Sequence, residues 1–472
     1  MRLPKITLNK KPVYRKFAED VDFYDIFSRV EQTFETCYLL ESLGEQGRFS
    51  RYSIIGFSPK HIIQANGTTL FFDDESYQVG NPYYALREIM PEQTFSRKYA
   101  GGLFGYLSYE AMNYLEPVLD LTVNDQFPRF MFGVYTDGLV YDTMTGELFY
   151  FYYDNDRLDE IKGCLEKTPK KRALSISGIR DSVDSDQHAR MVEQTKEQIR
   201  AGNTFQCQVG YRREFTMKGD PLLIYEQLRQ VNPSPFMFYL KFGKRVLVGA
   251  SPELLFKMDD RFMETYPLAG TVKRGNTAAE DTRLARQLLN DPKEIAEHNM
   301  LVDLHRNDIG RVAELGTVKI LNLMDIKKFS HVQHISSEIT GILRSGEDIF
   351  SALASNFPAG TLSGAPKIES MKIIDKIEGM GRGPYGGAVG HFGFNGNGTF
   401  TIPIRSCYLN GSHGYTQASG GIVFDSVPEN EYEEIQRKMG AITDVLRMYE
   451  AKKCKPKEEA HLHREKRKLR KK

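Results

Sequence analysis

The chain has 472 residues, of which 40% are hydrophobic and 26% are charged, as is ordinary for a soluble globular protein of two or three domains. The formal net charge of +1 hides a basic end, because residues 452–472 hold eleven Lys or Arg against three Glu, a surplus of eight that leaves the rest at about −7. That body lacks the basic face expected of a nucleic-acid-binding protein. The sequence contains no run of roughly 18 apolar residues, so no membrane span is predicted.

The cysteines and the first residues of the chain bear on its cellular compartment. Five cysteines are scattered without a CxxC pair, and this odd count favours reduced thiols. Residues 1–14 lack the apolar core of a secretion signal. We therefore expect a cytoplasmic protein.

Residues 15–167 are predicted to form a strand-rich N-terminal lobe. Segments 51–56, 70–72 and 130–141 are rich in β-branched and aromatic residues and are bounded by Gly, Pro or Asp. Residues 168–186 are polar and show little periodicity, so we interpret them as a linker or a crossover connection.

Residues 187–449 are predicted to form a second domain that mixes helices and strands. This domain opens on residues 187–200, where apolar positions recur at helical spacing. The highly charged residues 450–472 that follow it are predicted to be a basic, disordered tail.

The strongest local signal is an acidic helix that begins near residue 292. Asp291 can cap its N-terminus, and Pro292 suits the first helical position. Glu294 and Glu297 are spaced i, i+3, so the two carboxylates share one face of the helix.

A second acidic helix is predicted after residue 427. Ser426 and Glu429 have the spacing of a capping box at its start. Glu431, Glu434 and Lys438 follow at i, i+3 and i+7, so they also share one helical face.

The two acidic faces leave two interpretations open. Four carboxylates on two helices could hold Mg²⁺, a hard cation that prefers oxygen ligands and keeps several waters. Acidic helix faces are also common as solvated surface, and spacing alone favours this second interpretation.

Residues 357–367 form a Gly-rich run before a helix predicted over residues 369–377, which is the arrangement of an anion cradle. The run is not a Walker loop, since no Gly-Lys-Ser or Gly-Lys-Thr follows it. Gly381, Gly383 and Gly386 match the dinucleotide-binding spacing, but they follow a predicted helix rather than a strand. NAD binding is therefore not expected there.

Two further polar positions each carry an alternative. Arg405 ends a strand predicted over residues 402–405, where it suits either a carboxylate ligand or an ordinary surface ion pair. His331 and His334 have the spacing of a metal-ligand pair, although such histidines are more often buried hydrogen-bonding residues.

Several long motifs together resemble those of a known family. From about Cys37 to Met448 the chain resembles the chorismate-utilising enzymes, and within them the anthranilate synthase large subunits. The motifs that carry the resemblance are residues 39–42, 232–235, 267–271, 294–308, 360–367, 385–390 and 421–438. The resemblance implies an α+β fold of two lobes, with facing β-sheets flanked by helices and an active site in the second lobe.

The resemblance also implies a reaction, a cofactor and site residues. Chorismate and ammonia would give anthranilate and pyruvate, the first step of tryptophan biosynthesis, in a Mg²⁺-dependent lyase reaction. Glu297 and Glu434 would bind the metal directly, while Glu294 and Glu431 would hold its waters. The implied substrate-binding residues are Ala269, Gly270, Thr271, Tyr385, Arg405, Gly421 and Lys438. The implied catalytic residues are Glu253, the general acid for loss of the C4 hydroxyl, His334, linked to pyruvate elimination, and Thr361.

Two positions bear on the product. Isochorismate synthases use a Lys to activate water where this chain has Gln206, which cannot act as a base. Aminodeoxychorismate synthases often carry a nucleophilic Lys where this chain has Ala269. Both absences favour direct attack by ammonia and anthranilate as the product. An aminodeoxychorismate synthase of the folate route remains the alternative, because some of those enzymes lack the Lys.

The resemblance further implies a partner and an inhibitor. No glutaminase segment is visible in the chain, so we expect a separate glutamine amidotransferase subunit to supply ammonia from glutamine. Tryptophan is expected to inhibit the enzyme from a second site. The residues expected to bind it are Glu41, Ser42, Asn232, Pro235, Phe236 and Met237. Neither a nucleic acid nor a membrane is expected as a partner.

Overall fold

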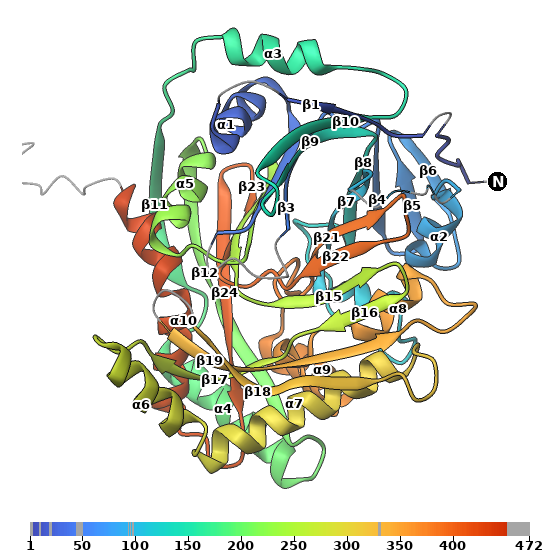
Figure 1. Cartoon of the computed structure of the whole chain (residues 1–472). Helices are drawn as coiled ribbons and strands as arrows, with labels where there is room; N and C mark the ends of the chain where they lie inside the picture. Colours follow the sequence, from blue (N-terminus) through green and yellow to red (C-terminus); the bar gives the residue numbers. More distant parts are fainter. Residues whose placement is uncertain are drawn as a thin grey trace, which may run out of the picture.

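The computed structural model describes residues 3–8, 11–17, 21–43, 51–92, 94, 96, 99–328 and 332–450. In these residues two large antiparallel sheets face each other, and helices flank them (Figure 1). None of the described helices is both long and apolar enough to cross a membrane. His331 and the predicted basic tail, apart from Glu450, lie outside the described residues.

The first sheet has 12 strands and draws on both halves of the chain. Its strands, in spatial order, are β1 (Val13–Lys16), β10 (Glu147–Tyr152), β9 (Asp137–Asp142), β3 (Tyr52–Phe57), β2 (Thr36–Glu41), β13 (Phe236–Phe242), β14 (Arg245–Ser251), β23 (Ser406–Asn410), β24 (His413–Ile422), β12 (Gln206–Gly219) and β11 (Leu174–Asp181), with β20 (Gly364–Ala365) paired to β12.

The second sheet also has 12 strands from both halves. Its order is β17 (Leu268–Lys273), β19 (Val332–Ile342), β16 (Phe262–Thr265), β15 (Leu254–Asp259), β22 (Gly398–Thr401), β21 (Ala388–Gly393), β7 (Gly102–Leu107), β8 (Phe130–Tyr135), β4 (His61–Asn66), β5 (Thr69–Phe72) and β6 (Glu75–Gln78), with β18 (Lys319–Lys328) paired to β19.

The helices lie outside and at the ends of the two sheets (Figure 1). They are α1 (Phe23–Thr33), α2 (Pro82–Ile89), α3 (Leu158–Glu166), α4 (Ser185–Arg200), α5 (Leu222–Val231), α6 (Ala278–Leu288), α7 (Pro292–Gly310), α8 (Ile349–Asn356), α9 (Lys367–Glu378) and α10 (Pro428–Met448), with short 3-10 helices η1 (Tyr109–Tyr114) and η2 (Gly360–Leu362).

Strand β2 shows how the two faces of a sheet serve two cores. Successive side chains of a strand point to opposite faces. Tyr38 points toward the second sheet and stacks on Phe104, with ring centroids 3.7 Å apart. Cys37 and Leu39 point the other way and join the core that α1 and α5 cover. The first sheet is therefore buried on both faces here.

Most predicted elements are confirmed. The three predicted strand segments coincide with β3, β5 and the β8–β9 pair. The helices predicted over residues 187–200 and 369–377 coincide with α4 and α9, and the two acidic helices coincide with α7 and α10. The linker prediction over residues 168–186 was wrong, because residues 174–181 form β11 and pair with β12 at the edge of the first sheet. Pairing along an edge strand needs no apolar alternation, so the polar sequence concealed it.

The division of the chain into two lobes has no counterpart in the sheets. Both sheets take strands from residues 15–167 and from residues 187–449. The boundaries of the two predicted domains therefore remain a proposal.

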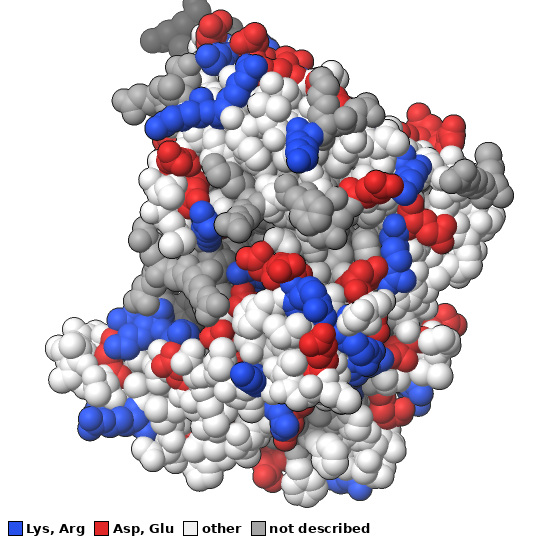
Figure 2. Space-filling view, turned by 45° about the vertical axis from the view of Figure 1, so that its right-hand side comes forward, with Lys and Arg blue, Asp and Glu red and all other residues white. Residues whose placement is uncertain are grey.

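Figure 2 shows one face of the molecule, on which positive and negative side chains are interspersed, so this face offers no extended surface of one sign.

Candidate active site

Helices α7 and α10 carry the four predicted carboxylates toward the same site. Helix α7 begins as predicted, since the Asp291 side chain accepts hydrogen bonds from the backbone of Lys293 and Glu294. Helix α10 begins at Pro428, so Ser426 lies one residue too early to cap it. The predicted capping box is wrong, and the Ser426 hydroxyl instead accepts a hydrogen bond from the Val423 N–H at 3.0 Å.

Electrostatics show that the carboxylates of the two helices are neighbours. Burial raises the pKa of Glu294, and the like charges of Glu297, Asp291 and Glu434 add to the increase. Burial also raises the pKa of Glu431, and Glu434 again contributes. Like charges held together in this way favour binding of a cation. The observation supports the metal interpretation over solvated surface.

Protein donors already contact the two predicted metal ligands. Gln206 Nε2 donates to Glu297 Oε1 at 3.0 Å, and Lys438 Nζ lies 2.8 Å from Glu434 Oε1. Burial would raise the pKa of Glu434, but the charge and hydrogen bond of Lys438 lower it below its usual range. Both carboxylates are therefore held in place by protein donors.

The residues present fit a magnesium ion. Among the described residues no group of three or more His, Cys, Asp or Glu could hold a metal. Mg²⁺ needs only one or two carboxylates when waters and a substrate carboxylate complete its shell. Two glycines leave room beside the carboxylates, because a Cβ on Gly270 would lie 2.9 Å from Glu294 Oε2 and one on Gly420 would lie 3.0 Å from Glu431 Oε2.

Glu253 is a buried carboxyl group next to the Gly-rich run. It precedes β15 and is 6% exposed, and its Oε1 accepts a hydrogen bond from Thr361 Oγ1 at 2.9 Å. Burial raises the pKa of Glu253 to about 7, although Thr361, Lys438 and Arg405 oppose the shift. At neutral pH much of Glu253 is therefore protonated and can donate a proton.

His334 lies across from Gly270 at an irregularity in the sheet. The register between β17 and β19 shifts at Gly270, which has φ +66°, and this turns its carbonyl toward the imidazole. His334 Nδ1 lies 2.9 Å from Gly270 O and 3.1 Å from Thr271 Oγ1. Burial lowers the pKa of His334 to about 4, so the ring is neutral at physiological pH. A donating Nδ1–H leaves the lone pair on Nε2.

Arg405 is a cation in the same electrostatic environment. The predicted strand at residues 402–405 was wrong: β22 ends at Thr401, and Arg405 has φ 50° in the loop that follows. Burial lowers the pKa of Arg405, and the charge of Glu253 opposes that shift. Among the described residues its guanidinium makes no hydrogen bond or ion pair, which leaves its donors for an anion.

Ser419 joins two of the predicted substrate-binding residues. Tyr385 OH lies 2.8 Å from Ser419 Oγ, and Lys438 Nζ donates to Ser419 O at 2.8 Å. The neighbouring Gly421 faces Gln206, since a Cβ there would lie 2.4 Å from Gln206 Nε2. Sequence reasoning missed Ser419, because a serine among glycines carries no local signal of this role.

Two further residues, Ala269 and Asp308, lie near the predicted site. Ala269 is 8% exposed and pairs with Ile335 beside His334. Asp308, to which the sequence motifs assign no role, forms a buried ion pair of 2.8 Å with Lys367. This pair ties the end of the Gly-rich run to helix α7.

Comparison with known proteins shows which family the chain belongs to. Residues 35–444 match the family described as chorismate binding enzyme. The chain belongs to this family. It is 52% identical to anthranilate synthase component 1 of Leptospira biflexa, over 95% of this chain and 98% of that protein.

Two solved structures confirm the expected α+β fold of this chorismate-binding enzyme. The crystal structure of anthranilate synthase component I from Streptococcus pneumoniae TIGR4 is 31% identical, with a TM-score of 0.76 over 84% of this chain and 93% of that chain. The menaquinone-specific isochorismate synthase of Escherichia coli is 17% identical and shares the fold, with a TM-score of 0.71 over 93% of this chain and 95% of that chain.

The chorismate-binding enzyme also has a cavity of about 1030 Å³ between its two sheets. Ser42, Pro235 and Phe236 line it from the first sheet, and Lys257 and His391 line it from the second. Its volume is ample for an amino acid the size of tryptophan. Five of the six residues predicted for the inhibitor line this cavity, namely Glu41, Ser42, Pro235, Phe236 and Met237.

Glu41 and Met237 line the cavity but direct their side chains to the other face of the sheet, and Asn232 does not line the cavity. Glu41 faces the helix-covered side of β2, where its carboxylate accepts from Tyr225 OH at 2.8 Å and from Arg229. Met237 pairs with Glu41 and packs in the same outer core. Asn232 ends α5 and is not among the residues lining the cavity. The strand alternation that places Ser42 inward places Glu41 outward, and local sequence did not reveal this.

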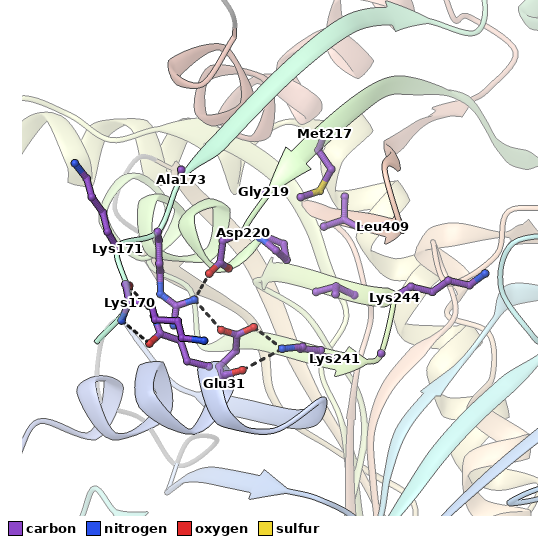
Figure 3. A pocket seen from close by; sticks show the side chains of 16 residues that line it. Glu31, Lys170, Lys171, Ala173, Met217, Gly219, Asp220, Lys241, Lys244 and Leu409 are labelled. Carbon is purple, nitrogen blue, oxygen red and sulfur yellow. Dashed lines mark hydrogen bonds and ion pairs between the residues drawn. The ribbon is translucent and has the colours of Figure 1, made fainter. Parts of the chain in front are cut away.

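A second cavity of about 530 Å³ lies beside α1 (Figure 3). Glu31 accepts from Arg172 at 2.7 Å and from Lys241 at 2.8 Å, and Arg172 also pairs with Asp220. Lys171 and Lys244 point away from this group in Figure 3. Its inward-facing cations are therefore neutralised by carboxylates, and we assign it a structural role.

Proposed function

We propose that this chain is the chorismate-using subunit of an anthranilate synthase, which converts chorismate and ammonia to anthranilate and pyruvate. The observation that carries the proposal is the buried Glu253, whose pKa is raised to about 7, in one electrostatic environment with Arg405, His334 and the carboxylates of α7 and α10. The 52% identity to a protein named anthranilate synthase component 1 supports this product. The reaction is the first step of tryptophan biosynthesis.

The proposed chemistry divides between two protein groups. Hydroxide is a poor leaving group, so protonated Glu253 donates its proton to the C4 hydroxyl, which leaves as water while ammonia adds at C2. His334, whose imidazole ring is neutral at physiological pH, then assists the elimination of pyruvate that makes the ring of the product aromatic. Arg405, Tyr385 and Lys438 bind the carboxylates of chorismate.

Mg²⁺ is the proposed cofactor, held by Glu297 and Glu434, with Glu294 and Glu431 binding its waters. When bound, it would polarise the ring carboxylate and stabilise developing negative charge. Gln206 keeps Glu297 oriented through the 3.0 Å hydrogen bond. Because that amide cannot act as a base, water is not activated at this position, and ammonia is the nucleophile.

A glutamine amidotransferase subunit is the proposed partner. The designation component 1 of the similar proteins implies a second component. Ammonia is largely protonated at neutral pH, and a channel from a partner would deliver it unprotonated. The four cysteines that the structure describes are free and buried, which supports the proposed cytoplasmic location.

Feedback inhibition by tryptophan in the cavity between the sheets is the last part of the proposal. Strand β15 begins directly after Glu253 and supplies Lys257 to the cavity, and Thr401, which also lines it, donates to Glu253 O at 2.7 Å. A ligand that shifts these strands would displace the general acid without touching chorismate.

Chromatography of the products tests the proposal. The purified chain would be incubated with chorismate, ammonium and Mg²⁺, and we expect anthranilate and pyruvate in equal amounts. A para-substituted aminobenzoate precursor would instead identify the folate-route alternative, against which Ala269 argues. The absence of both products at saturating ammonium would overturn the assignment.

A further inference from the structure

Arg382 is the largest fully buried side chain of the described residues. Its side chain and that of Glu378 are both 2% exposed. The pair is bidentate, with Nε donating to Oε2 at 2.9 Å and one terminal nitrogen donating to Oε1 at 2.7 Å. A buried ion pair of this kind must satisfy its remaining donors nearby.

Those remaining donors reach two separate segments of the site. One terminal nitrogen of Arg382 donates to Leu362 O at 2.7 Å, and the other donates to Gln208 O at 2.6 Å. Leu362 follows Thr361, whose hydroxyl contacts Glu253. Gln208 pairs with Gly421 in the β12–β24 register.

A third segment is held by ring contacts. The guanidinium of Arg382 lies 5.5 Å from the ring centroid of Tyr385 and 4.6 Å from that of Tyr109, the first residue of η1. Glu378 extends the same network, because its Oε1 accepts from the Gly210 N–H at 2.9 Å. The pair thus fastens the Gly-rich run, strand β12 and the Tyr385 loop to one another.

We propose that Arg382 is a positioning residue that sets the relative placement of Thr361, Tyr385 and strand β12 for the reaction. The inference rests on the proposed function only because the conversion of chorismate is the reaction by which it is measured. Arginine is required because its planar guanidinium donates in fixed, divergent directions, whereas the single ammonium of lysine cannot reach both carbonyls and keep the carboxylate. Misplacement by about 1 Å at such a site can cost about 100-fold in rate.

The experiment is a pH profile of the Arg382→Lys variant. Lysine keeps the charge beside Glu378 but releases Leu362 O or Gln208 O. We expect kcat/KM for chorismate to fall about 10- to 100-fold, with a raised KM because Tyr385 is displaced. A loosened Thr361 stabilises the Glu253 carboxylate less, so the alkaline limb of kcat/KM should move to higher pH. A loss of stability alone would move neither KM nor the limb.

Arg157→Lys is the matched control. Arg157 is also bidentate to a carboxylate, Asp137, and also donates to two backbone carbonyls, those of Phe57 and Ser58. It lies away from the site, so Arg157→Lys should lower the melting temperature and leave KM and the pH limb unchanged. If Arg382→Lys fails to fold, the neutral Glu378→Gln, Arg382→Gln pair is measured in the same way.

Two results would overturn the inference. A profile of Arg382→Lys, or of the neutral pair, that superimposes on the wild type would leave Arg382 with a purely structural role. An equal shift in Arg157→Lys would show that any lost ion pair produces the effect. Failure of the proposed function would be seen separately, because the wild type would then form no anthranilate.

Discussion

Thr361 Oγ1 donates a 2.9 Å hydrogen bond to Glu253 Oε1, and so joins the Gly-rich run to the start of β15 across 108 residues of sequence. Burial raises the pKa of Glu253 to about 7, and this hydrogen bond limits the rise because it stabilises the carboxylate. Burial and this hydrogen bond therefore act in opposite directions on the pH range of the proposed general acid.

Replacing Thr361 by Val should shift that range upward. A general acid must be protonated, so wild-type kcat/KM should decrease as the pH rises through about 7. Removing a hydrogen bond to a charged group costs about 1.5 kcal/mol, which is about one pKa unit. We expect the alkaline limb of Thr361→Val to lie about one unit higher, and that of Thr361→Ser, which keeps the hydroxyl, to stay in place. Coincident limbs for Val and wild type would refute this role.

Glu434→Gln should abolish Mg²⁺-dependent turnover and leave the fold intact. A neutral amide cannot supply the charge that a hard cation requires. The control is Glu433→Gln on the same helix, because the Glu433 side chain is 70% exposed and forms its ion pair with the exposed Arg437. Activity would be titrated against Mg²⁺, with circular dichroism to verify the fold. Near wild-type activity of Glu434→Gln at any Mg²⁺ concentration would contradict the metal assignment.

His334→Met should separate amination from pyruvate loss. The pKa of His334 is lowered to about 4, so its ring stays neutral and able to accept a proton throughout the physiological range. Methionine cannot accept that proton, and an aminated, non-aromatic intermediate should accumulate. The exposed His413, replaced by Met, serves as the control. Pyruvate release by His334→Met at the wild-type rate would show that another group performs the elimination.

Ser42→Phe should weaken inhibition by tryptophan while most activity is retained. The new ring would fill part of the 1030 Å³ cavity on the side of β2. The concentration of tryptophan that halves the rate should rise by about tenfold or more, equivalent to about 1.4 kcal/mol of binding. Ser76→Phe on the exposed strand β6 should respond like the wild type. Identical titrations for Ser42→Phe and wild type would mean that the cavity does not regulate activity.

Ammonium alone should support turnover by the purified chain, whereas glutamine should require a partner subunit. The two nitrogen sources would be compared at constant chorismate, with and without a glutamine amidotransferase. Because free ammonia increases with pH, the ammonium-dependent rate at subsaturating ammonium should rise with pH until protonated Glu253 becomes limiting. Efficient glutamine use by the single chain would contradict the proposed partnership.

Local sequence was sufficient where the signal is local. Asp291 and Pro292 predict the start of α7, and the spacing of Glu294 and Glu297 predicts their common face, because helical periodicity follows from backbone geometry. The ordered motifs predict the family and its fold. The polar edge strand β11 and the loop at Arg405 were missed, since neither carries a periodic apolar pattern.

Tertiary structure decided which side chains meet. Whether Glu41 faces the cavity or Arg229 depends on the register of β2 against β13, and a shift of one residue would reverse it. The contacts of Arg382 with Gln208, 174 residues away, depend on the packing of α9 against β12. Such hydrogen bonds join groups that no local pattern relates, so the sequence determined the chemistry of this protein and only the packed fold determined its geometry.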